Sequence, residues 1–418
     1  MSRGIPATVE SRYPNWPLLI AVPTLLVIGE LFIFSAGYVG PDWPVQPLYR
    51  QQLKWSLLGM FCHAGCVLCD FRRLRAISVA GYAVCLLLLV LTLVAGESIG
   101  GARRWLDLLG LRMQPAEAAK LATVLALAYC LPAMPGTAPI REQLRLLFST
   151  ALIVGFPFLL IAKEPALGNA LTLVPAAVAV LYVAGLSWRF MGAIVLSALL
   201  VGGIWVGGAG LAVKAQHQEI TAERLLQRMG LRSYQVDRLK RFLGSSRDPR
   251  GRDWNSEQSK IAVAVGGWCG TGFLGGKQKQ LGYVPRPVAP TEFIFAVICE
   301  EAGFMGATIV IFLYLVVIAT GLLTALQAED REGRLLCVGI VAILFAHVVV
   351  NIAMIIGLLP ITGLPLPLLS YGGSCTITTL TALGLIQSVW RRSGERVYDD
   401  CAWGPSPSAP VRAPTPAS

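Results

Sequence analysis

Long runs of apolar residues recur along this chain of 418 residues, and short polar segments separate them. A helix needs about 20 mostly apolar residues to cross the hydrocarbon core of a bilayer. Segments of this kind lie near residues 17–37, 53–69, 76–95, 116–134, 146–162, 167–186, 189–213, 291–324, 335–359 and 373–390. The pattern predicts an all-α, polytopic membrane protein of about ten transmembrane helices, with its membrane domain at residues 17–396. The first run is too long for the apolar core of a signal peptide, so we expect it to be a permanent span.

The composition supports this prediction. Hydrophobic residues make up 55% of the chain and charged residues only 14%, whereas soluble proteins are about 25% charged. These values exclude a soluble enzyme and a disordered chain. The net charge of +11 is expected to lie in the loops and to interact with anionic lipid. No nucleic-acid-binding signature accompanies it.

The distribution of Lys and Arg predicts the orientation, because these residues accumulate in the short cytoplasmic loops of membrane proteins. Placing both termini in the cytoplasm puts most of the short-loop arginines there, including Arg72, Arg73, Arg75, Arg331, Arg334, Arg391 and Arg392. Residues 1–16 then form a cytoplasmic N-terminal segment, and the Pro/Ala/Ser-rich residues 397–418 form a disordered cytoplasmic tail. One long extracytoplasmic loop, at about residues 214–290, carries 14 basic and 6 acidic side chains.

Two polar clusters at the outer ends of predicted spans are candidates for chemistry. Glu117 and Lys120 are three residues apart, so on a helix they share a face; they form either part of a site or a structural ion pair. Lys163 and Glu164 lie between two spans with almost no connecting length. Lys163 is either a cation for a phosphate or an anchor at the lipid boundary.

A third cluster follows the long loop, where Glu292, Glu300 and Glu301 lie near the start of an apolar helix. Hydrocarbon disfavours ionised groups, so these carboxylates should face a wet interior, pair with cations or lie at the headgroup level. The glycine-dense residues 266–272 lack the features of a nucleotide loop and favour either close backbone approach or a re-entrant turn. Residues 357–374 are apolar but rich in helix breakers, so we expect irregular backbone that walls the substrate site.

Most of the ten cysteines lie inside apolar runs, where a thiol behaves as a small hydrophobic group. Cys62, Cys66 and Cys69 share a helical face near His63, but packing is favoured over a metal site there. No His, Cys and carboxylate set with ligand spacing occurs in the outer segments. We therefore predict no metal site and no cofactor, apart from a loosely bound divalent cation that a pyrophosphate would hold.

Three runs together carry a resemblance to a known family: GARRWLDL followed by QPAEAAK, TEFIFAVICEEAGFMG, and GLLPITGLPLPLLSYGGS. The chain is similar to the SEDS family of bacterial cell-wall proteins, which includes RodA, FtsW and SpoVE. The loop runs YQVDRLKRFL, NSEQSKIAVAVGG and GKQKQLGYVP are closer to the RodA branch. The resemblance covers roughly residues 17–392.

The resemblance implies a peptidoglycan glycosyltransferase in the cytoplasmic (inner) membrane of a bacterium. It would polymerise lipid II on the outer face, beside a class B penicillin-binding transpeptidase. The family's proposed catalytic base aligns with Glu292, where Asp is usual. Three further positions depart from the family pattern: Ala166 replaces Asp, Asn169 replaces Thr or Ser, and Ala116 replaces Ser.

Polymerisation needs a base for the acceptor hydroxyl and cations for the departing lipid pyrophosphate. Glu292 is the candidate base, and Glu117 is expected to orient Lys120. The remaining candidates for substrate binding are Arg104, Lys120, Lys163, Arg238, Gln258, Ser370 and Ser374. Two alternatives use the same fold: a lipid II flippase, and a catalytically weakened scaffold for the transpeptidase.

Overall fold

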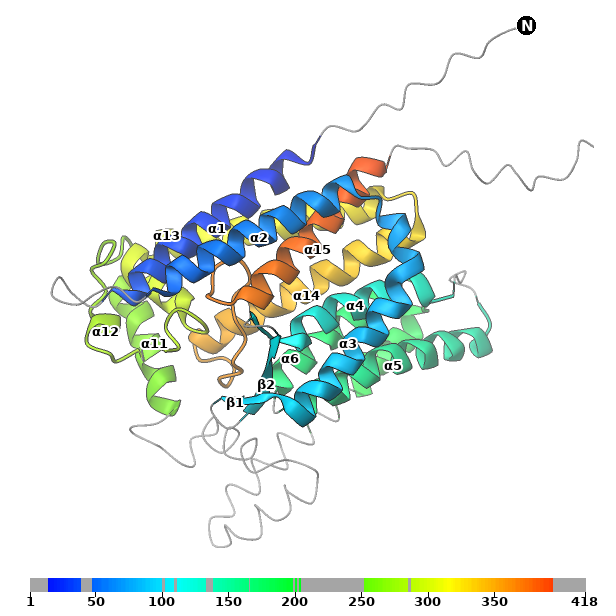
Figure 1. Ribbon diagram of the computed structural model, residues 1–418, viewed down its shortest axis with the longest axis horizontal. Coiled ribbons are helices and arrows are strands. Elements are labelled where there is room, and N and C mark those ends of the chain that lie inside the picture. Colours follow the sequence, from blue (N-terminus) through cyan, green and yellow to red (C-terminus); the bar gives the residue numbers. More distant parts are fainter. Residues whose placement is uncertain are drawn as a thin grey trace, which may run out of the picture.

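The computed structural model describes residues 14–38, 47–99, 102–108, 111–132, 138–164, 166–197, 200, 203, 252–284 and 287–393. This part of the chain is mostly helical, and its long helices run side by side (Figure 1). Its elements are α1 (Trp16–Gly37), α2 (Leu48–Leu68), η1 (Phe71–Leu74), α3 (Arg75–Ala95), β1 (Glu97–Ile99), β2 (Ala102–Leu108), β3 (Leu111–Met113), α4 (Pro115–Cys130), α5 (Ile140–Lys163), α6 (Leu167–Leu171), α7 (Leu173–Val183), α11 (Arg252–Gly266), α12 (Lys277–Gln280), α13 (Ile294–Gln327), α14 (Arg331–Ile355) and α15 (Gly373–Arg392).

Helices lie at the predicted spans, although the seventh is described only over Trp188–Ser197. Five helical segments in the described residues are long and apolar enough to cross a membrane: Trp16–Gly37, Phe71–Ala95, Ile140–Lys163, Ile294–Gln327 and Arg331–Ile355. The others fall short for local reasons. α4 has only 16 residues, and the sixth predicted span divides at Thr172 into α6 and α7. The total of ten spans therefore stays a prediction.

Small residues let α2 and α15 pack closely. A Cβ on Gly59 would lie 2.5 Å from Leu380 Cδ1, and one on Gly384 would lie 2.6 Å from the His63 carbonyl oxygen. Close approach of this kind is typical of helix pairs in membranes. The His63 ring is buried, and its Nδ1 forms a hydrogen bond of 3.0 Å with the Leu380 carbonyl oxygen. This histidine therefore links α2 to α15.

A small antiparallel sheet in the order β1-β2-β3 lies between α3 and α4. Glu97 pairs with Trp105 across the first ladder, and Leu106 pairs with Met113 across the second. The prediction of an all-α chain missed this sheet, because its strands are short and lie within a connection between two spans. The sheet matters for function because it presents Arg104.

The second half of the predicted outer loop packs on the helices. α11 contacts α13, and a Cβ on Gly270 would lie 2.1 Å from the Glu301 carbonyl oxygen. The predicted close backbone approach is thereby confirmed. Glu301 accepts hydrogen bonds from Ser35 Oγ at 2.7 and 2.8 Å and pairs with Lys279 of α12, so this carboxylate is neutralised by a cation. Burial lowers the pKa of Lys279, and the Glu301 carboxylate opposes that shift.

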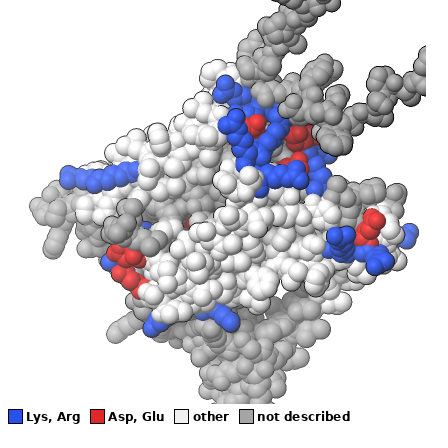
Figure 2. Space-filling model, turned by 45° about the vertical axis from the view of Figure 1, so that its right-hand side comes forward, with Lys and Arg blue, Asp and Glu red and all other residues white. Residues whose placement is uncertain are grey.

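Charged side chains also gather at the other end of the helices. Arg72 pairs with Asp330 at 2.8 Å, and Arg392 lies 3.7 Å from Asp70. Figure 1 shows the start of α1 and the end of α15 at this same end. Blue and red side chains gather at the edges of the face in Figure 2, and a broad white area lies between them. Of the predicted N-terminal segment, residues 1–16, the structure describes only residues 14–16. The predicted tail at residues 397–418 lies outside the described residues, which end at residue 393.

Candidate active site

An open cavity of about 860 Å³ lies where β2, α2, the start of α15 and the irregular residues 356–372 meet. Its wall includes Glu292 and Arg104. The remaining lining residues are Gln51, Lys54, Trp55, Leu58, Trp105, Arg112, Gln114, Thr291, Gly363, Pro365, Tyr371, Gly372, Gly373, Ser374 and Cys375. The predicted irregular backbone is found at residues 357–372, whereas Gly373 and Ser374 begin α15; part of this segment walls the cavity.

The backbone around Glu292 is tied to two other elements. Asn351 of α14 is fully buried, and its Nδ2 donates to the carbonyl oxygens of Glu292, at 2.9 Å, and Leu364, at 2.7 Å. Gly363 has φ +77°, and a Cβ there would lie 3.2 Å from Glu292 Oε1. The carboxylate is therefore held beside a backbone position that favours glycine.

Three cations line the cavity with this carboxylate. Arg104 is half-buried on β2, and its Nε donates to the Glu164 carbonyl oxygen at 3.2 Å. Lys54 of α2 and Arg112 of β3 are exposed, and Arg112 lies 3.5 Å from Glu97. Arginine and lysine in one cavity are suited to a polyanion such as a pyrophosphate.

Polar contacts join the walls of the cavity. The Gln114 backbone N–H donates to Ser374 Oγ at 2.9 Å, which links β3 and α4 to the first turn of α15. The Tyr371 backbone N–H donates to the Pro290 carbonyl oxygen at 2.8 Å, and its hydroxyl donates to Gln51 Oε1 at 2.7 Å. Burial raises the pKa of Tyr371. Its phenol is therefore a neutral donor at physiological pH.

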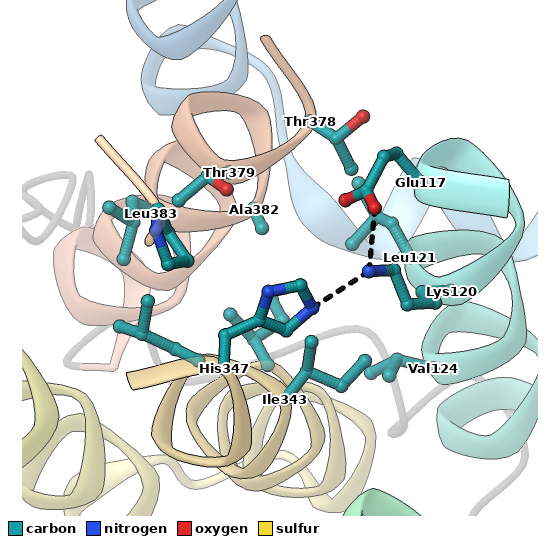
Figure 3. A pocket seen from close by; sticks show the side chains of 13 residues that line it. Glu117, Lys120, Leu121, Val124, Ile343, His347, Thr378, Thr379, Ala382 and Leu383 are labelled. Atoms are coloured by element: carbon teal, nitrogen blue, oxygen red, sulfur yellow. Dashed lines mark hydrogen bonds and ion pairs between the residues drawn. The ribbon is translucent and has the colours of Figure 1, made fainter. Parts of the chain in front are cut away.

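Glu117 and Lys120 do not line the open cavity; they form a buried cluster in the wall of a second, smaller pocket (Figure 3). Lys120 Nζ lies 2.8 Å from Glu117 Oε1, 2.8 Å from His347 Nε2 and 3.4 Å from Asn169 Oδ1. The Glu117 and Lys120 residues are only 4% and 2% exposed. The ammonium group is therefore surrounded by partners from three helices. This arrangement matches a structural ion pair, which is one of the two alternatives that the sequence left open for Glu117 and Lys120.

Glu164 caps the C-terminal end of α5, and its carbonyl oxygen binds Arg104 of the cavity wall. The residue is fully buried, and neither carboxyl oxygen has a hydrogen-bond partner among the residues that the structure describes. Burial raises the pKa of Glu164 to about 8, and the charge of Arg104 opposes this shift. A carboxyl group in this environment is mostly protonated at pH 7.

The other predicted site residues are found in different settings. Ser370 is buried, and its Oγ accepts a hydrogen bond from the Leu366 N–H at 2.7 Å, so it closes a turn. Gln258 is buried on α11 and does not line the cavity. Lys163 is exposed in the last turn of α5. Arg238 lies outside the described residues.

Sequence reasoning missed Asn351 and His347 and did not select Lys54 or Arg112. An asparagine and a histidine inside an apolar run of α14 were the available signal, because polar groups at membrane depth are costly and acquire partners. Lys54 begins the second predicted span and Arg112 precedes the fourth, and no local pattern marks either residue as a ligand. Their convergence on one cavity depends on the packing of α2 against the sheet and α15.

The described chain is thus a multi-pass helical membrane protein with a carboxylate and several cations in one open cavity. The sequence pattern of the FtsW/RodA/SpoVE cell cycle protein family matches residues 16–395. The chain belongs to this family, and the resemblance predicted from the sequence is confirmed.

The relatives carry the activity that the resemblance implies. Peptidoglycan glycosyltransferase MrdB of Escherichia coli (strain K12) is 36% identical over 380 residues, which cover 89% of this chain and 92% of that protein. A chain of a solved peptidoglycan synthase complex that coordinates polymerization and crosslinking has a TM-score of 0.69 at 31% identity, covering 91% of this chain and 98% of that one. The crystal structure of Thermus thermophilus rod shape determining protein RodA has a TM-score of 0.62 at 29% identity, with coverage of 91% and 97%.

Proposed function

We propose that this chain is a peptidoglycan glycosyltransferase that polymerises lipid II into glycan strands. The observation that carries the proposal is the open cavity in which Glu292 shares a wall with Arg104, Lys54 and Arg112. One group of the kind that accepts a proton and several that bind a polyanion are what this reaction requires.

In the proposed reaction, Glu292 accepts the proton of the acceptor sugar hydroxyl. The freed oxygen attacks the sugar carbon that carries the lipid pyrophosphate, and the bond from this carbon to the phosphate oxygen breaks. The configuration inverts, and the electron pair leaves with the pyrophosphate. Arg104, Lys54 and Arg112 stabilise the charge that develops there.

The longer side chain of Glu at position 292 needs support from its surroundings. Asn351 holds the Glu292 backbone, and Gly363 leaves room beside the carboxylate. We infer that these two contacts accommodate the additional methylene. Lys163 and Arg238 stay in the proposal as further cations, and Gln258 stays as a substrate-binding residue.

We further propose ten spans, an outer loop at about residues 214–290, and termini on the inner face of the cytoplasmic membrane. The arginine-rich end near Arg72 and Arg392 supports this orientation, because such residues mark the cytoplasmic side. The cavity then opens on the outer face. A class B penicillin-binding transpeptidase is the proposed partner, supported by the similarity to a chain of a synthase complex with crosslinking activity.

The test is lipid II polymerisation by the purified protein with its transpeptidase partner. Glu292→Gln should lower the rate by roughly 10²–10⁴, the usual contribution of a general base. The control is Glu329→Gln, an exposed carboxylate between α13 and α14, which should leave the rate unchanged. Unchanged polymerisation by Glu292→Gln would exclude this residue as the base. Movement of labelled lipid II across vesicles without polymer would instead support a flippase.

A further inference from the structure

A buried carboxyl group without a hydrogen-bond partner among the described residues lies beside Arg104 of the cavity wall. Glu164 ends α5, and its backbone N–H bonds to the carbonyl oxygens of Leu160 and Ile161, so the position of the residue is fixed. Its carbonyl oxygen accepts the Nε–H of Arg104 at 3.2 Å. Both of its carboxyl oxygens are buried, and in the described part of the chain neither has a hydrogen-bond partner.

The mechanism above gives this group no role, yet its burial is unfavourable. A buried carboxylate without hydrogen bonds is strongly destabilised relative to water, so the neutral acid is favoured. Arg104 acts in the opposite direction, because its charge favours ionised Glu164. The same guanidinium lines the cavity. Arg104 therefore interacts with an acid that can lose its proton and also lines the space where an anion would bind.

We propose that Glu164 is a positioning residue that sets how much positive charge Arg104 presents to the cavity, so that protonation of Glu164 and binding of the anionic pyrophosphate favour each other. Neutral Glu164 does not compete for the charge of Arg104. Ionised Glu164 competes for that charge and repels the phosphates. The inference rests on the proposed function for the identity of the ligand as a lipid pyrophosphate.

Other charged groups near Glu164 are few among the described residues. Lys163 lies next to it on α5, and the elements packed against this helix are α3, α4, α6 and α7. α6 and α7 carry no charged residues, and the one on α3 is Arg75, at the far end. α4 contributes Glu117 and Lys120, which bind each other. Arg104 of β2 is the cation whose charge bears on Glu164.

The sign of the pH dependence follows from this linkage. Below pH 8 Glu164 holds its proton in the empty site, so pyrophosphate affinity should not depend on this group. Above pH 8 the empty site loses the proton, and binding must restore it. If the bound state stays protonated, affinity should fall about tenfold between pH 7 and pH 9.

The experiment measures binding of undecaprenyl pyrophosphate, which the proposed reaction releases, to the full chain in nanodiscs of neutral lipid from pH 6.5 to pH 9. Between pH 7 and pH 9, the affinity of the wild type for this ligand should fall about tenfold more than the affinity of Glu164→Gln. Glu142→Gln, an exposed carboxylate at the other end of α5, is the matched control and should follow the wild type. In an Arg104→Gln background, the effect of Glu164→Gln at pH 9 should be smaller, because loss of the Arg104 charge raises the pKa of Glu164 further.

Parallel pH profiles of the wild type and Glu164→Gln would overturn the inference. A second measurement, proton uptake on ligand binding, uses the wild type alone. Binding at pH 8.5 should be accompanied by proton uptake by Glu164, whereas at pH 6.5 Glu164 already holds its proton and should take up none. Absence of uptake at pH 8.5 would also overturn it. Because binding is measured without turnover, a protein that shows the linkage but makes no polymer would contradict the proposed function alone.

Discussion

Two polar sites lie among the apolar helices, and they use the same residue types in opposite ways. In the open cavity, Glu292 shares a wall with Arg104, Lys54 and Arg112 and is within reach of solvent. In the buried cluster, Glu117 is bonded to Lys120, which also lies 2.8 Å from His347.

The difference concerns what each cation can still bind. Lys120 has Glu117, Asn169 and His347 around its ammonium group and is almost fully buried, so a ligand would have to displace them. Arg104 and Lys54 line the open cavity. Closed polar clusters hold helices together, whereas open ones are available to substrate. The comparison can be tested by variants that separate stability from activity.

The largest effect is expected from Lys120→Met. Removing one partner of a buried ion pair leaves an uncompensated charge and costs about 3–5 kcal/mol of stability. The apparent Tm of the purified protein should fall clearly. The double variant Glu117→Gln/Lys120→Met should recover most of this loss, because it removes both charges. A stable but inactive Lys120→Met protein would contradict the structural role and favour direct contact with the substrate.

A smaller effect is expected from Arg104→Gln. A charge-assisted hydrogen bond contributes about 1.5–3 kcal/mol, so kcat/KM for lipid II should fall by roughly one to two orders of magnitude. The Tm should change little, because the side chain is half-exposed. Arg103→Gln is the neighbouring control: Arg103 is exposed, binds the Val94 carbonyl oxygen at 3.3 Å and does not line the cavity. Equal losses in both variants would contradict the assignment.

The smallest effect is expected from Gly363→Ala. A side chain at φ +77° costs about 1–2 kcal/mol, and the new Cβ would lie 3.2 Å from Glu292 Oε1. We expect a several-fold decrease in kcat with little change in KM. Gly282→Ala has a similar φ of +74° and nothing within 4 Å of its Cβ, so it should show the strain without the loss of kcat. Matching kcat values would show that the contact has no effect.

Much of the fold was predictable because the bilayer requires long apolar helices, and these leave a clear pattern in the sequence. The positions of α1, α3, α5, α13 and α14 follow from hydropathy alone. The sheet at residues 97–113 was missed, because strands of three to seven residues carry almost no periodic signal.

The candidate site was predictable only in part. The clusters that contain Arg104, Glu292 and Ser374 could be selected as polar groups or helix breakers beside apolar runs, and these residues do meet at one cavity. The same reasoning selected Lys120, which is enclosed, and overlooked Asn351, which holds the Glu292 backbone. Local sequence shows that a polar group needs a partner, but it does not show which partner.

The sequence by itself determined that this protein is a helical membrane protein of the FtsW/RodA/SpoVE family, because hydropathy and contiguous motifs are properties of the chain read in order. Only the tertiary structure decided which charged residues are open to a ligand and which are closed. Glu292 and Arg104 are 188 positions apart, and whether a carboxylate meets solvent, a cation or a histidine depends on helices that pack from distant parts of the chain.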